Sequence, residues 1–128
     1  MITPPARVPL AFFQSLQSND PIATWQSLSL RSQRVIVRLL AQQLPYDTIS
    51  SLDKAFAEGK EPAITYWQSF RQSLDLNQWL QQQYQALGES NGEVLVKCLP
   101  SGIHLRVLLE NQQWKFGYIE TFMDGLVD

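Results

Sequence analysis

The sequence predicts an α+β fold, in which an N-terminal helical layer packs on a C-terminal three-stranded antiparallel meander. Helix start and stop signals recur through the first two-thirds of the chain, alternating apolar segments follow Asn91-Gly92, and short turns separate those segments. A length of 128 residues suits one domain. We therefore expect a single domain over 1–128, helical over about 9–87 and sheet over about 92–120.

Proline and capping residues mark the first helices. Pro9 opens the first one. Asp20 followed by Pro21 is typical of an N-cap and a first helical position, and starts a short second helix. Ser29 caps the clearest helix, over residues 30–44, where leucine and valine recur at helical spacing.

Three further helix starts follow, at Asp47, Pro62 and Asp75, and Gly59 is the natural C-terminal cap of the first of these helices. Asp75 begins a pattern that resembles a capping box, so we expect a last helix over residues 76–87. Glutamine is dense in this segment. A solvated helix face is the first interpretation, and a hydrogen-bonding surface for a partner is the alternative.

The C-terminal third predicts three strands, EVLVKCL, IHLRVLLE and QWKFGYIE, joined by short turns. Alternation places one apolar row on each strand. These rows are Val94, Val96 and Cys98; then Ile103, Leu105, Val107 and Leu109; then Trp114, Phe116 and Tyr118. Because a lone three-stranded sheet leaves its apolar face bare, the preceding helices are expected to cover it.

Composition excludes several classes of function. A net charge of -2 and a pI near 5.3 argue against general nucleic-acid binding. One cysteine and one histidine exclude the usual zinc sets, so we expect no metal and no other cofactor. No apolar run approaches the length of a membrane span, and the proline-broken start does not resemble a secretory signal. A soluble, cytoplasmic protein is the expectation.

No catalytic constellation emerges from the sequence, and we predict no catalytic residue. Cys98 shares a strand face with valines, as a core thiol does, and only His104 is available as its base. No glycine-rich phosphate loop or serine elbow is present. Carboxylates are available, but no pair stands out for acid–base work; they are Asp47, Asp53, Glu58, Glu61, Glu93, Glu110, Glu120 and Asp124.

Two features suit a protein-binding surface. Arg31, Arg34 and Arg38 form one stripe on the long helix, which is either a solvated face or an anchor for an acidic or C-terminal carboxylate partner. The chain also carries more aromatic side chains than a small core needs, so some are expected at an interface. The predicted partner-binding residues are Arg31, Arg34, Arg38, Trp114, Phe116 and Tyr118.

The segment over residues 91–120 resembles the tail of the nuclear-transport-factor-like, or cystatin-like, α+β cone families. The resemblance is carried by Gly92 to Leu99, Ile103 to Glu110, and the Trp-Lys pair within Gln113-Trp114-Lys115-Phe116. It implies a curved sheet with a pocket between helices and sheet. Such pockets serve small-ligand enzymes in some members and protein binding in others.

These observations favour a small non-enzymatic adaptor or assembly factor, chaperone-like, that recognises a peptide segment of a partner protein. Strand addition to QWKFGYIE, as an open edge, is the expected mode, unless the tail from Thr121 to Asp128 covers that edge. The alternative is a cone-type pocket protein, an isomerase or hydratase that uses a buried carboxylate. A homo-oligomer whose aromatics pack a self-interface is a third interpretation.

Overall fold

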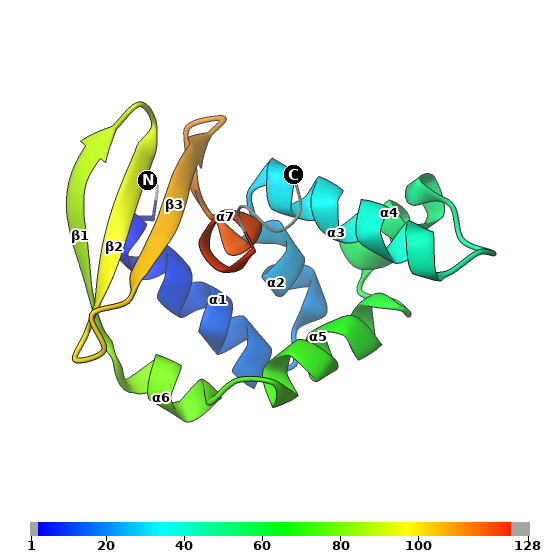
Figure 1. Ribbon diagram of the computed structural model, residues 1–128, viewed down its shortest axis with the longest axis horizontal. Coiled ribbons are helices and arrows are strands. Elements are labelled where there is room, and N and C mark those ends of the chain that lie inside the picture. The colour runs from blue at the N-terminus through cyan, green and yellow to red at the C-terminus, as the bar shows by residue number, and fades with distance from the viewer. Residues whose placement is uncertain (1–2, 124–128) are drawn as a thin grey trace.

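The computed structural model describes residues 3–123 and confirms the α+β class, with helices first and an antiparallel sheet after them (Figure 1). The sheet has four strands in the order β1-β2-β3-β4, one more than predicted. The helices are η1 (Pro5–Arg7), α1 (Val8–Gln17), α2 (Pro21–Gln26), α3 (Leu30–Gln43), α4 (Ile49–Glu58), α5 (Ala63–Gln72), α6 (Leu76–Gln81) and α7 (Tyr118–Phe122). The strands are β1 (Gln83–Ser90), β2 (Glu93–Leu99), β3 (His104–Glu110) and β4 (Gln113–Phe116).

The predicted caps account for most helix starts. The Asp20 side chain accepts the N–H of Ala23 at 3.1 Å, and the Ser29 Oγ accepts the N–H of Ser32 at 3.2 Å. The start of α4 differs by one residue from the prediction. Its N-cap is Thr48, because Thr48 and Ser51 cap each other's backbone reciprocally, and Asp47 lies outside the helix.

The predicted helix over 76–87 is wrong in its second half. Helix α6 ends at Gln81, and the chain continues as β1, which pairs antiparallel with β2. Asn91 and Gly92, with φ of 55° and 74°, form the tight turn that returns the chain into β2. Gln82, expected on a solvated face, is buried, and its Oε1 accepts the Ser101 hydroxyl at 2.6 Å. The pairing with β2 therefore overrides the helical preference of the glutamines.

The last predicted strand is too long. Strand β4 ends at Phe116, and Tyr118 begins the short helix α7. The chain turns at Gly117, whose N–H donates to the Arg106 carbonyl at 2.8 Å. A Cβ at this position would lie 2.9 Å from that same oxygen, so only glycine permits the approach. Consequently Trp114, Phe116 and Tyr118 do not share one strand face.

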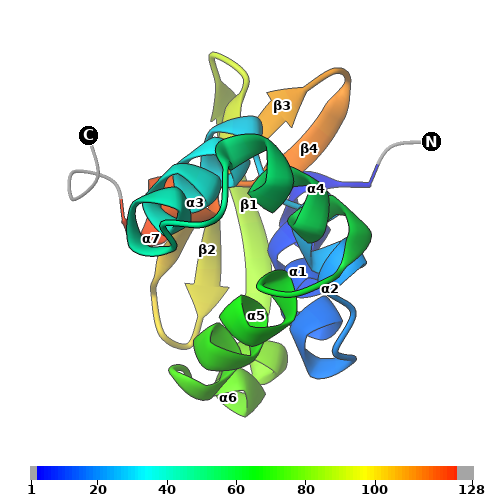
Figure 2. The ribbon, with the colours of Figure 1, turned by 90° about the vertical axis from the view of Figure 1, so that its right-hand side faces the viewer.

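Helices cover one face of the sheet, and the other face is left open (Figure 2). The covered face carries the predicted rows of β2 and β3: Val94, Val96, Cys98, Leu105 and Val107 are all buried. Ile103 and Leu109, at the two ends of the β3 row, are more than 40% exposed, so the predicted row is too long at both ends.

The aromatic side chains fill the space between helices and sheet. Phe12 of α1 lies at the centre, with its ring centroid 6.0 Å from Trp67 of α5, 4.7 Å from Phe116 of β4 and 6.1 Å from Tyr118 of α7. Most of the aromatic rings that were expected to exceed the needs of the core are therefore packed within it. Tyr46, at the α3–α4 connection, is the clear exception because it is almost fully exposed.

Candidate functional site

The six predicted partner-binding residues separate into two groups. Arg31, Arg34 and Arg38 all lie on α3. Arg34 and Arg38 are exposed and Arg31 is half-buried. Trp114 is half-buried and lines a groove of about 300 Å³ between β4 and the start of α1. Phe116 and Tyr118, however, are 0% and 4% exposed. Those two residues are core residues, and the prediction that they are accessible on a strand face is wrong.

The β4 edge, where strand addition was expected, is already paired at its last residue, Phe116. The N–H of Phe116 donates to the Ser27 carbonyl at 2.7 Å, and the Phe116 carbonyl accepts the N–H of Ser29 at 2.9 Å. Beyond β4, the Arg106 N–H of β3 donates to the Thr121 hydroxyl of α7 at 2.9 Å. The α2–α3 connection and α7 thus cover this side of the sheet at Phe116 and beyond the end of β4. Residues 124–128 of the predicted tail, with Asp124, lie outside the described residues.

The opposite edge, β1, is open (Figure 1). All residues of β1 except the half-buried Tyr84 are exposed, and η1 lies close to this strand. No backbone group from residues 3–123 pairs with β1 across its outer side. The ladder with β2 is regular from Gln83 to Ala86 and shifts register before Glu89. Within the described part of the chain, strand β1 therefore presents a row of unpartnered backbone donors and acceptors.

The titratable groups with shifted pKa values are poorly suited to catalysis. Burial raises the pKa of the Cys98 thiol to about 11, so the thiol is neutral near pH 7. His104 is exposed and Cys98 faces the core from the neighbouring strand, so His104 is not placed to act as its base. Burial also raises the pKa of Tyr118, whose hydroxyl shares a 3.0 Å hydrogen bond with that of Tyr66.

Glu120 is the one buried carboxylate among residues 3–123, and its contacts are structural. Its Oε2 accepts the Ser29 hydroxyl at 2.9 Å and its Oε1 accepts the Ser32 hydroxyl at 2.9 Å. Glu110 serves the same helix end, since its carboxylate accepts the N–H of Leu30 at 3.0 Å. Two carboxylates thus lie at the N-terminus of α3, where the helix dipole stabilises negative charge.

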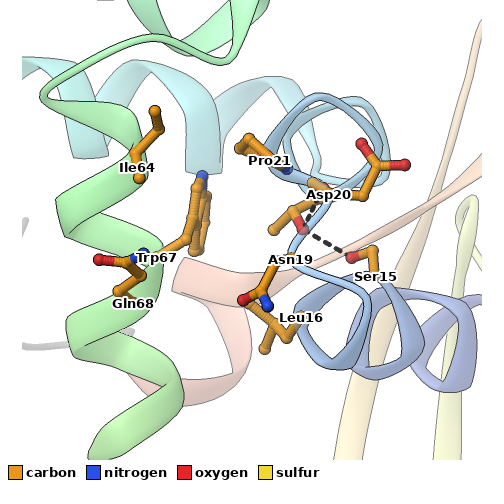
Figure 3. A pocket seen from close by; sticks show the side chains of 9 residues that line it. Ser15, Leu16, Asn19, Asp20, Pro21, Ile64, Trp67 and Gln68 are labelled. Carbon is orange, nitrogen blue, oxygen red and sulfur yellow. Dashed lines mark hydrogen bonds between the residues drawn. The ribbon is translucent and has the colours of Figure 1, made fainter.

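A narrow crevice lies between α5 and the corner formed by α1 and α2 (Figure 3). Its volume is about 40 Å³. The Trp67 indole stands along it, and its nitrogen lies between the side chains of Ile64 and Pro21 (Figure 3). Trp67 is 4% exposed, and its Nε1 has no hydrogen-bond partner among residues 3–123. This crevice could not be predicted from the sequence, because it forms only where three helices meet.

Two absences bear on function within residues 3–123. No group of three or more histidine, cysteine, aspartate or glutamate side chains is arranged to hold a metal ion. No helix in this part of the chain has both the length and the apolar character needed to cross a membrane.

Comparison with protein-family models, with curated proteins and with solved structures finds no match to this chain.

Proposed function

We propose that this protein is a small non-enzymatic binding module, an adaptor or assembly factor, that captures an extended segment of a partner protein by strand addition to β1. The open edge of β1 is the observation that carries the proposal. An added strand would satisfy the unpartnered backbone groups of β1, which is the usual basis of affinity in this mode. A single buried thiol is consistent with a reducing, cytoplasmic setting.

The regular part of β1 limits where a partner pairs. The strand is in register with β2 from Gln83 to Ala86, and the irregularity before Glu89 bends the rest. We therefore expect the main backbone contacts over this first half. Side chains of the partner would alternate between the face of Tyr84 and the face of Gln85, and specificity would come from these contacts.

Charge defines the partner's chemistry. Glu89 is the only charged residue of β1, and its side chain is exposed. A like charge opposite it would be repelled, so the partner segment is uncharged or basic at that end. The arginine stripe lies on α3, away from β1 (Figure 1). Recognition of an acidic or C-terminal partner by Arg31, Arg34 and Arg38 therefore stays a separate prediction.

The test uses a display library of extended peptides selected against the purified full chain. Leu87→Lys is the edge variant, because a lysine on an edge strand opposes strand addition. Leu95→Lys is the matched control, since both leucines are 38% exposed and Leu95 belongs to the interior strand β2. A selected peptide should bind Leu87→Lys about tenfold more weakly and bind Leu95→Lys as well as it binds the wild type.

Amide hydrogen exchange locates the bound peptide. The proposal requires slower exchange of backbone amides within Gln83–Ser90 when the peptide is present. Protection confined to α3 would transfer the site to the arginine stripe. Sedimentation of the protein alone tests whether a second copy occupies the edge. A dimer that is dissociated by Leu87→Lys and is not dissociated by Leu95→Lys would show this, and would overturn the proposal.

The alternative function, that of a cone-type pocket protein, has less support from the structure. It depends on a buried carboxylate that is free to exchange a proton with a ligand. In Glu120, both oxygens are engaged by the hydroxyls of Ser29 and Ser32. The resemblance to the cone families stays a prediction.

A further inference from the structure

Among residues 3–123, the indole N–H of Trp67 lacks an acceptor, although the side chain is almost completely buried. An indole nitrogen only donates, and a buried donor without a partner costs roughly 1–3 kcal/mol. Buried polar groups in folded proteins almost always have a partner, which can be ordered water. The position of Trp67 along the crevice supplies the space for one (Figure 3).

Nearby hydroxyls do not meet this need. Ser15 Oγ and Thr24 Oγ1 lie 2.6 Å apart, and each also contacts a backbone carbonyl, at 2.6 Å and 2.9 Å. Their protons are engaged within the α1–α2 corner, and neither hydroxyl oxygen accepts the N–H of Trp67. Asn19 and Gln68 also line the crevice and are exposed, and the Asn19 Oδ1 already accepts a hydrogen bond from Arg71 Nη1 at 2.8 Å.

The size of the crevice decides what the occupant is. A cavity needs at least about 10–15 Å³ to hold one water molecule, and organic ligands need several hundred. The crevice, at about 40 Å³, admits one or two waters and excludes a larger ligand. Asp20 also lines the crevice, but its carboxylate points away from it (Figure 3) and accepts the N–H of Ala23 at 3.1 Å.

We infer that this crevice is a hydration site of the native fold, in which a long-lived water accepts the hydrogen bond of Trp67 Nε1. The water would bridge α5 to the corner of α1 and α2, so it is part of the packing of the helical layer. The inference is independent of the proposed peptide-binding edge, because β1 contributes no residue to the crevice.

The test is a pair of water-selective NOE and ROE spectra of the ¹⁵N-labelled full chain. The chain has four tryptophans, and the indole resonance of Trp67 is identified as the one that the Trp67→Phe variant lacks. A long-lived water gives NOE and ROE cross-peaks of opposite sign at this proton. Trp114, which is half-buried at a groove, is the internal control for short-lived surface hydration, where both cross-peaks have the same sign.

Two results would overturn the inference. Absence of any water cross-peak at the Trp67 indole, with Trp114 showing hydration, would mean that the crevice is dry. Loss of the cross-peak in Thr24→Val would assign it to exchange through the Thr24 hydroxyl, and would also overturn the inference. Ser69→Ala, at an exposed position of the same helix α5, is the matched variant that leaves the cross-peak unchanged.

Discussion

Glu120 joins the C-terminal helix to the start of α3 through the hydroxyls of Ser29 and Ser32, and Ser32 in turn accepts the N–H of Ile119 at 3.0 Å. Hydrogen bonds to a buried charged group are among the stronger ones in a protein. Glu120→Gln keeps the size of the side chain but replaces one acceptor oxygen with a donor. We expect the free energy of unfolding to fall by about 1.5–3 kcal/mol, measured by urea denaturation.

Glu89→Gln is the control for this substitution, because Glu89 is exposed on β1 and should change stability by less than about 0.5 kcal/mol. Equal stability of the two variants would mean that the Glu120 contacts contribute little. The sequence predicted Ser29 as a cap but not its link to Glu120. Capping is a local signal, whereas Ser29 and Glu120 are 91 residues apart and meet only in the folded chain.

Local signals also explain which elements were predictable. Starts at Asp20, Ser29 and Asp75 are set by side chains within three residues of the helix, so they could be read from the sequence. Strand β1 could not be read from its own residues, because QYQALGES shows no clean apolar alternation and its stability comes from pairing with β2. The Asn91-Gly92 turn was the signal for it, since such a turn joins two strands.

At the end of α4, Gly59 adopts a left-handed conformation with φ of 68°. A Cβ here would also lie 2.9 Å from Cγ1 of Ile22, at the start of α2. Gly59→Ala should therefore destabilise the protein by more than about 1 kcal/mol, through backbone strain and displacement of Ile22. Thermal unfolding followed by circular dichroism measures this loss.

Gly88→Ala provides the comparison within the same chain. Nothing lies within 4 Å of a Cβ at Gly88, and its φ is not in the left-handed region. An alanine there should be neutral or slightly stabilising. If both variants lose the same stability, neither the left-handed backbone nor the Ile22 contact of Gly59 explains the effect.

The whole molecule is held by one core, although its helices and strands are separated along the chain. Among residues 3–123, helices cover one face of the sheet, and they bury their apolar sides on it and on each other (Figure 2). Phe12 is at the meeting point, fully buried between α5, β4 and α7. The sequence predicted that helices cover the sheet, because the meander alone could not be stable. It did not predict which ring lies at the centre, because that depends on how the layers are oriented.

This shared core predicts that the two parts of the chain unfold together. Phe12→Ala should lower the free energy of unfolding by about 3–5 kcal/mol, and should shift the urea midpoints of helical and sheet residues equally. Residue-resolved NMR intensities of α4 and β2 amides follow the two parts separately. Tyr46→Ala, at an almost fully exposed ring, should leave both midpoints within error. If Phe12→Ala does not fold, the milder Phe12→Leu serves the same comparison. A shift confined to α4 would mean that the helical layer is an independent unit, and that the sheet, with its open β1 edge, draws its stability from elsewhere.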